Sequence, residues 1–105
     1  MEQLEYEFDG AGSLRQSGPA VLVGVVSSGN LEVLVESADL GGRGRIVVNT
    51  SVRGFGEIWQ AVLTDFAGRH NLANLLISIN DAGATPAVVS LRLDQAAEEF
   101  YRGEP

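Results

Sequence analysis

The chain has 105 residues, with fourteen acidic against seven basic side chains, a net charge of −7, and neither cysteine nor lysine. This composition excludes disulfides, thiolate metal sites, cysteine nucleophiles and lysine-based Schiff-base or phosphate chemistry. The acidic balance disfavours nucleic acid and favours basic patches on other proteins as partners. The length predicts a single domain over residues 1–105.

An alternation of apolar and acidic residues predicts the first strand. Leu4, Tyr6 and Phe8 alternate with glutamates and an aspartate, which is the period-two pattern of a half-buried strand. We expect an edge strand with an acidic outer face. A loop rich in glycine and serine follows it, up to Pro19.

A β-hairpin is predicted around the polar tip Ser27-Ser28-Gly29-Asn30, because two apolar runs flank it and Gly beside Asn supplies the positive φ angles of a tight turn. The run before the tip, 21–26, is apolar on both faces, which is typical of a central strand covered on both sides. The run after the tip, 31–35, alternates in part. We expect the hairpin to hold a serine hydroxyl in solvent.

A second glycine-rich turn, from Gly41 to Arg45, precedes a fourth strand. Four strands in succession, joined by short turns, predict an antiparallel meander. The residues that define the fourth strand are Ile46, Val48, Thr50 and Val52.

The apolar spacing then changes to three and four, which predicts an amphipathic helix lying across the sheet. The apolar stripe is broad and places Trp59 in the core, and Gly68 with the polar residues 69–71 ends the helix. Its members are Phe55, Ile58, Trp59, Val62, Leu63 and Phe66.

A fifth strand is predicted from Leu75 to Asn80, stopping at Asp81-Ala-Gly83. Thr85-Pro86 then predicts the start of a second helix by its cap chemistry. An alternative keeps residues 89–93 as a sixth strand, with the helix beginning near Asp94. The local cap favours the long helix, with a buried stripe of Val89, Leu93, Ala96, Ala97 and Phe100. The predicted fold class is α+β, an antiparallel sheet of about five strands with two helices packed on it, and not a four-helix bundle.

No group of residues is typical of a catalytic or metal site, and none is assigned. His70 is the only histidine, and at a helix end it is more often a partner of the helix dipole than a base. Arg43 and Arg45 can hold a phosphate, but turn arginines are more often solvated. A turn serine such as Ser27 or Ser28, without a nearby base, is a poor catalyst but a sound attachment point for a phosphodiester.

The sequence has no run of about 20 apolar residues that predicts a membrane span, and no signal peptide pattern. We therefore expect a cytoplasmic protein with no membrane partner.

Several motifs in a fixed order resemble the acyl carrier (delta) subunit of malonate decarboxylase and, more distantly, the citrate lyase acyl carrier (gamma) subunit. The resemblance covers roughly residues 20–99. The motifs are Val26-Ser-Ser-Gly-Asn-Leu-Glu-Val-Leu34, Thr50-Ser-Val52, Trp59-Gln-Ala61, Asp81-Ala-Gly-Ala-Thr-Pro86, Leu91-Arg-Leu93 and Glu98-Glu99.

The resemblance implies a carrier subunit that is not itself an enzyme. Ser28, directly before Gly29 and Asn30, would carry a covalently attached 2′-(5″-phosphoribosyl)-3′-dephospho-CoA arm. The thiol of this arm would hold acetyl or malonyl as a thioester between a transferase subunit and carboxylase-like decarboxylase subunits. A separate transferase would attach the prosthetic group.

The sequence departs from the family pattern at four positions. Asn30 stands where an aspartate is usual, Ser27 where a glycine is usual, and Asn80 and Ala82 where histidine and phenylalanine are usual. Ser27 therefore adds a second candidate hydroxyl. Two alternatives remain: a carrier for citrate lyase, and an unmodified protein-interaction domain, which fits the acidic surface equally well.

Overall fold

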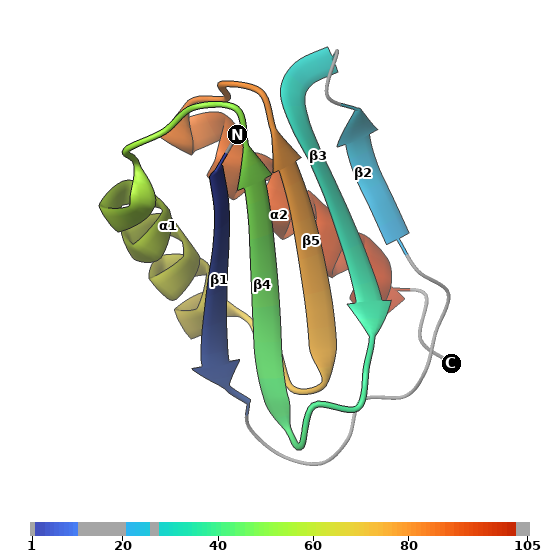
Figure 1. The fold of residues 1–105 in the computed structure, drawn as a ribbon. Helices are drawn as coiled ribbons and strands as arrows, with labels where there is room; N and C mark the ends of the chain where they lie inside the picture. The colour runs from blue at the N-terminus through green and yellow to red at the C-terminus, as the bar shows by residue number, and fades with distance from the viewer. Residues whose placement is uncertain (1, 11–20, 26–27, 103–105) are drawn as a thin grey trace.

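The fold is a five-stranded sheet with two helices (Figure 1). The structure, a computed structural model, describes residues 2–10, 21–25 and 28–102. The predicted α+β class is confirmed. In chain order the elements are β1 (Glu2–Asp9), β2 (Val21–Val25), β3 (Ser28–Ser37), β4 (Arg43–Thr50), α1 (Gly56–Arg69), β5 (Leu75–Asp81) and α2 (Pro86–Arg102).

The strands lie side by side in the order β1-β4-β5-β3-β2. Strands β4 and β5 are parallel and the other neighbours are antiparallel. The predicted meander is therefore wrong: β1 is not paired with β2, nor β3 with β4. A parallel pair needs a connection that returns the chain to the opposite end of the sheet, and α1 supplies it between β4 and β5.

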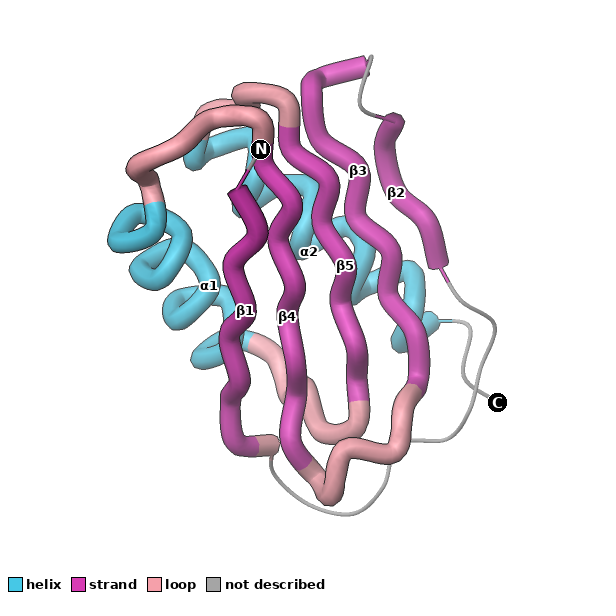
Figure 2. The backbone as a smooth tube through the Cα atoms, in the orientation of Figure 1, coloured by secondary structure: helices cyan, strands magenta, loops and turns pink. Residues whose placement is uncertain are grey.

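The position of β2 also differs from the prediction. It lies at the edge of the sheet, and Leu22 on its outer face is 56% exposed. Both helices pack behind the sheet, and no described element covers the face toward the viewer (Figure 2). An apolar run on both faces of a strand therefore did not indicate burial on both faces. The other edge is β1, as predicted, with exposed acidic side chains alternating with half-buried apolar ones.

The core lies between the sheet and the two helices. Helix α1 buries Trp59, Leu63 and Phe66. Helix α2 begins at Pro86 as predicted, so the alternative sixth strand is excluded, and all five residues of its predicted stripe are buried. Burial of one such side chain, for example Leu93, contributes about 2 kcal/mol.

Three predictions about the segment around α1 need correction. Strand β4 ends at Thr50, which leaves Val52 exposed in the following loop. Phe55 and Ile58 are 43% and 45% exposed, because the apolar stripe is wider than the face of α1 that reaches the sheet. Gly68 lies inside the helix, which runs to Arg69.

At the end of the sheet where β4 and β5 begin, neighbouring loops contact one another through their backbones. We call this region, residues 38–44 and 70–75, the closed end. Asn74 is buried with a φ of 58°, and its Oδ1 atom accepts hydrogen bonds from the N–H groups of Leu40 and Gly42 at 2.9 and 3.1 Å. Gly44 lies so close to Leu72 that a Cβ atom there would stand 2.6 Å from the Leu72 Cβ. The loops of this end are therefore held by specific contacts.

Candidate functional site at the open end of the sheet

The predicted hairpin is present as β2 and β3, but its turn is shifted. Val25 pairs with Ser28, so Ser28, Gly29 and Asn30 belong to the start of β3. The predicted tip residue Ser27 lies outside the described residues. The ladder has a register irregularity between Val23 and Val25. The predicted solvent exposure of positions 27–30 also lies outside the described side chains and stays a prediction.

Strand β3 is held on the sheet from Leu31 onward. It pairs with β5 from Leu31 opposite Asp81 to Ser37 opposite Leu75. Ser28 lies three residues beyond Leu31, about 10 Å further along the strand. It is therefore at the end of the sheet where β4 and β5 finish and the loops to α1 and α2 begin (Figure 1). We call this region, residues 28–31, 50–56 and 81–86, the open end.

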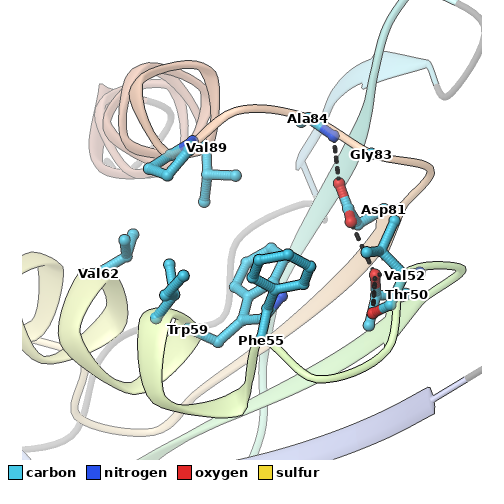
Figure 3. A pocket seen from close by; sticks show the side chains of 11 residues that line it. Thr50, Val52, Phe55, Trp59, Val62, Asp81, Gly83, Ala84 and Val89 are labelled. Atoms are coloured by element: carbon cyan, nitrogen blue, oxygen red, sulfur yellow. Dashed lines mark hydrogen bonds between the residues drawn. The ribbon is translucent and has the colours of Figure 1, made fainter.

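The open end also contains a pocket of about 290 Å³ beneath the loop that follows β4 (Figure 3). Its walls come from that loop, from the first turns of α1 and from the segment between β5 and α2. The lining is almost entirely apolar, with Trp59 and Val89 buried in its wall and Phe55 and Ile58 at exposed positions. Such a pocket binds apolar groups in preference to phosphates or carboxylates.

A small polar network supports one wall of the pocket (Figure 3). The buried Thr50 hydroxyl donates to Asp81 Oδ2 at 2.8 Å, and Asp81 Oδ1 accepts the Ala84 N–H at 2.8 Å. The Val52 N–H in turn donates to the Thr50 hydroxyl at 3.0 Å. Because each oxygen of Asp81 accepts a hydrogen bond, the carboxyl group serves to join the two loops.

Helix α1 is fixed over β1 at this end. The Tyr6 hydroxyl donates to the Gly56 carbonyl oxygen at 3.0 Å, and Glu2 accepts the Gly54 N–H at 3.2 Å. Burial raises the pKa of Tyr6, and the charge of Glu2 raises it further, so the phenol remains a donor at neutral pH. These contacts position the exposed residues at the mouth of the pocket.

The other candidates from the sequence lie away from the open end. Arg43 forms ion pairs with Asp9 and Glu7, at 2.8 and 3.3 Å. Arg45 also binds Glu7, and this hydrogen bond is the main reason that the pKa of Glu7 is lowered. The two arginines are therefore engaged by acidic side chains of β1.

His70 lies at the closed end, at the C-terminal cap of α1. Its Nε2 atom is 3.1 Å from Asp94 Oδ1, and Arg69 donates to the same carboxyl group at 2.7 Å. Burial opposes ionisation of Asp94, but the hydrogen bonds from Arg69 and His70 outweigh it and lower the pKa of the carboxyl group. This group links α1 to α2. Within the described ranges, no three histidine or acidic side chains gather as metal ligands.

Sequence reasoning did not predict the pocket. It gave Asp81 only as part of the motif 81–86, and it counted Phe55 and Ile58 in the apolar stripe of the helix. The sequence did contain a signal for the pocket, because residues from the three motifs at 50–52, 59–61 and 81–86 line it. Their proximity follows from the parallel pairing of β4 with β5, which sets Thr50 opposite Asp81.

Comparison with known proteins agrees with the motifs. The family model of the malonate decarboxylase delta subunit (MdcD) matches residues 19–100. This chain belongs to that family. Its relatives include malonate decarboxylase acyl carrier proteins of Stenotrophomonas maltophilia strain K279a, 57% identical over 100% of this chain and 99% of the relative, and of Xanthomonas campestris pv. campestris strain B100, 63% identical over 93% of each chain.

The delta subunit fold is also found in a solved structure. A chain in the crystal structure of a Pseudomonas malonate decarboxylase hetero-tetramer in complex with malonate matches with a TM-score of 0.80 and 44% identity, over 95% of this chain and 99% of that chain. Neither described helix of the present delta subunit is long and apolar enough to cross a membrane.

Proposed function

We propose that this delta subunit is the acyl carrier of a malonate decarboxylase complex, and that Ser28 is the attachment residue for phosphoribosyl-dephospho-coenzyme A. The observation that carries the proposal is family membership over nearly the whole chain together with the Ser28-Gly29 pair at the start of β3. The relatives reported above are named for malonate decarboxylase, which favours malonate over citrate as the substrate.

The backbone around Ser28 suits a covalent anchor. Ser28 begins β3, the second strand of the hairpin at this edge of the sheet, and Gly29 beside it has no side chain to block the approach of a modifying enzyme. The pairing of β3 with β5 from Leu31 onward limits the motion of the anchor. A firmly held anchor confines the volume that a tethered group searches and so raises its effective concentration at a partner. The attached group would supply a thiol that carries acetyl or malonyl.

The role proposed for this chain is to carry, while other subunits catalyse. At the open end, the Thr50 hydroxyl and the Asp81 carboxyl group bind each other and nearby backbone groups. Their arrangement supports the loops and offers no nucleophile activated by a base. Transfer of acetyl and removal of carbon dioxide are accordingly assigned to a transferase subunit and carboxylase-like subunits in the cytoplasm.

The test is the intact mass of the protein purified from its own host during growth on malonate, followed by peptide mapping across residues 21–36. We expect an increase equal to one phosphoribosyl-dephospho-coenzyme A group, located on Ser28. The variant Ser28→Ala should lose the increase and Ser27→Ala should keep it.

Two results would contradict this assignment. The same increase on Ser27 would move the attachment by one residue. An unmodified mass from cells that consume malonate would leave the unmodified interaction domain as the better description.

A further inference from the structure

Exposed apolar side chains of this protein are concentrated at the mouth of the pocket. In the described part of the chain, five large hydrophobic side chains are exposed, and three of them line this pocket. Clustered exposure of this kind marks interaction sites, whereas single exposed residues are ordinary. The three are Val52, Phe55 and Ile58, and the other two are Leu22 and Leu91.

The size of the pocket limits what can enter it. Its volume of about 290 Å³ is at the lower limit of the range of about 300–1,000 Å³ for small-molecule sites. The space suits one or two side chains better than a nucleotide or a long acyl chain. Trp59 and Val89 form a buried apolar wall, which is the surrounding that a hydrophobic anchor residue requires.

We propose that the pocket receives an apolar side chain of a partner subunit of the decarboxylase, from a segment that also carries arginine or lysine. This inference rests on the proposed function for the existence of the complex, but not on the attachment at Ser28. The start of β3 and the ends of β4 and β5 lie at the same end of the sheet (Figure 1), and the pocket is lined by residues that follow β4 and β5. A partner docked here would therefore be beside the hairpin.

The negative charge of this protein favours a basic partner segment in the pocket over an anionic ligand or a second copy of the chain. The Asp81 carboxyl group is in the pocket wall, which disfavours a malonyl group or another anion. Binding of a second copy of this chain would bring together two molecules that each carry a net charge of −7, and these would repel each other. A partner segment with basic residues beside its apolar anchor would instead be attracted by this negative charge. Glu57, in the first turn of α1 and next to Ile58 in the chain, supplies a further acidic side chain for such residues.

The first experiment measures binding of the full-length Ser28→Ala chain to the remaining decarboxylase subunits, purified together from the same organism. In this background we expect Ile58→Glu to weaken binding at least tenfold, because it places a charge at the pocket mouth. Leu91→Glu is the matched control: Leu91 is 57% exposed on α2 but does not line the pocket, and its variant should bind within twofold of the parent. Both variants should keep the parent's circular dichroism spectrum and thermal midpoint.

Binding of the folded Ile58→Glu chain with the parent's affinity would overturn the docking proposal alone. Failure of the parent and of Leu91→Glu to bind would overturn the complex as well. If the wild-type protein from its own host has no mass increase on Ser28, while Ile58→Glu still weakens binding, only the attachment site is contradicted. The two proposals can therefore fail separately.

A second measurement identifies the occupant. Trp59 is the only tryptophan and lies in the pocket wall, so labelling with 5-fluorotryptophan gives one reporter. We expect its ¹⁹F resonance to shift when the decarboxylase subunits are added to the unmodified chain. A shift on attachment of the prosthetic group alone, or on raising the concentration of the isolated chain, would overturn the proposal in favour of the chain's own arm or a second copy.

Discussion

The two ends of the sheet are built in different ways. At the closed end, Asn74 and Gly44 bring loops into backbone contact, and polar side chains are used to bind neighbouring loops. At the open end, one polar network supports an apolar pocket whose mouth carries exposed Phe55 and Ile58. The comparison shows that the loops where β4 and β5 begin pack closely against one another, whereas exposed apolar side chains gather where these strands finish.

The largest expected effect comes from breaking the closed end at Asn74. Replacement by alanine removes the acceptor of two backbone N–H groups and places a Cβ-bearing residue without a polar side chain at a φ of 58°. We expect a loss of about 3 kcal/mol in the free energy of unfolding. Asn74→Gly loses the same hydrogen bonds without the backbone strain, and should cost about 1 kcal/mol less. Urea denaturation of both variants measures the difference, and equal losses would contradict the role of backbone conformation.

Gly44 provides a second way to disturb the closed end. An added Cβ would meet the Leu72 Cβ at 2.6 Å and the Leu72 carbonyl oxygen at 2.7 Å, so Gly44→Ala should destabilise by about 2 kcal/mol. The matched variant is Gly68→Ala, in α1, where nothing lies within 4 Å of the added atom. It should stabilise by about 0.5–1 kcal/mol. Thermal unfolding of the two proteins should therefore move in opposite directions.

At the open end, Thr50→Val tests the support of the pocket wall. It removes the hydroxyl that donates to Asp81 and accepts from the Val52 N–H. We expect a loss of about 1.5 kcal/mol and weaker binding of the decarboxylase subunits. Thr50→Ser keeps the hydroxyl and should retain most of both properties. A serine variant as impaired as the valine variant would show that the methyl group, rather than the hydrogen bonds, supports the wall.

The smallest effect concerns the link between the helices at the closed end. Since the pKa of Asp94 is lowered in the folded protein, its ionised form stabilises the fold above the ordinary carboxyl value of 3.8, and this contribution is lost as the pH falls through the lowered value. The stability difference between wild type and Asp94→Asn should therefore shrink from about pH 5 downward. Denaturation series at several pH values check this. A difference that grows on acidification would contradict the direction of the shift.

Local patterns predicted most elements but not their arrangement. Alternation located β1, and the Thr85-Pro86 cap located the start of α2, because both signals depend on neighbouring residues alone. Alternation of apolar and polar residues predicts which face of a strand each side chain occupies, but it does not predict which strand is the neighbour. The parallel pairing of β4 with β5 was therefore missed. The pocket was missed for the same reason, since it exists only where the loops after Thr50 and Asp81 meet.

The attachment residue proposed here shows the same limit. Motif order singled out Ser28, but residue types did not reveal that Ser28 pairs with Val25 and so belongs to β3. The prediction that Trp59 lies in the core was confirmed. A large apolar side chain on the apolar stripe of an amphipathic helix faces the core, so the helical spacing alone was enough to predict it.

The strand order determines at which stage of synthesis the β2–β3 hairpin can join the rest of the sheet. Strand β3 pairs with β5, which is the last strand to be synthesised, and Leu31 meets Asp81 only after α1 has also emerged from the ribosome. Until then the hairpin has no neighbour on its inner side, and an isolated two-stranded hairpin is only marginally stable. The hairpin therefore gains its inner neighbour only after the segment up to Asp81 has been synthesised.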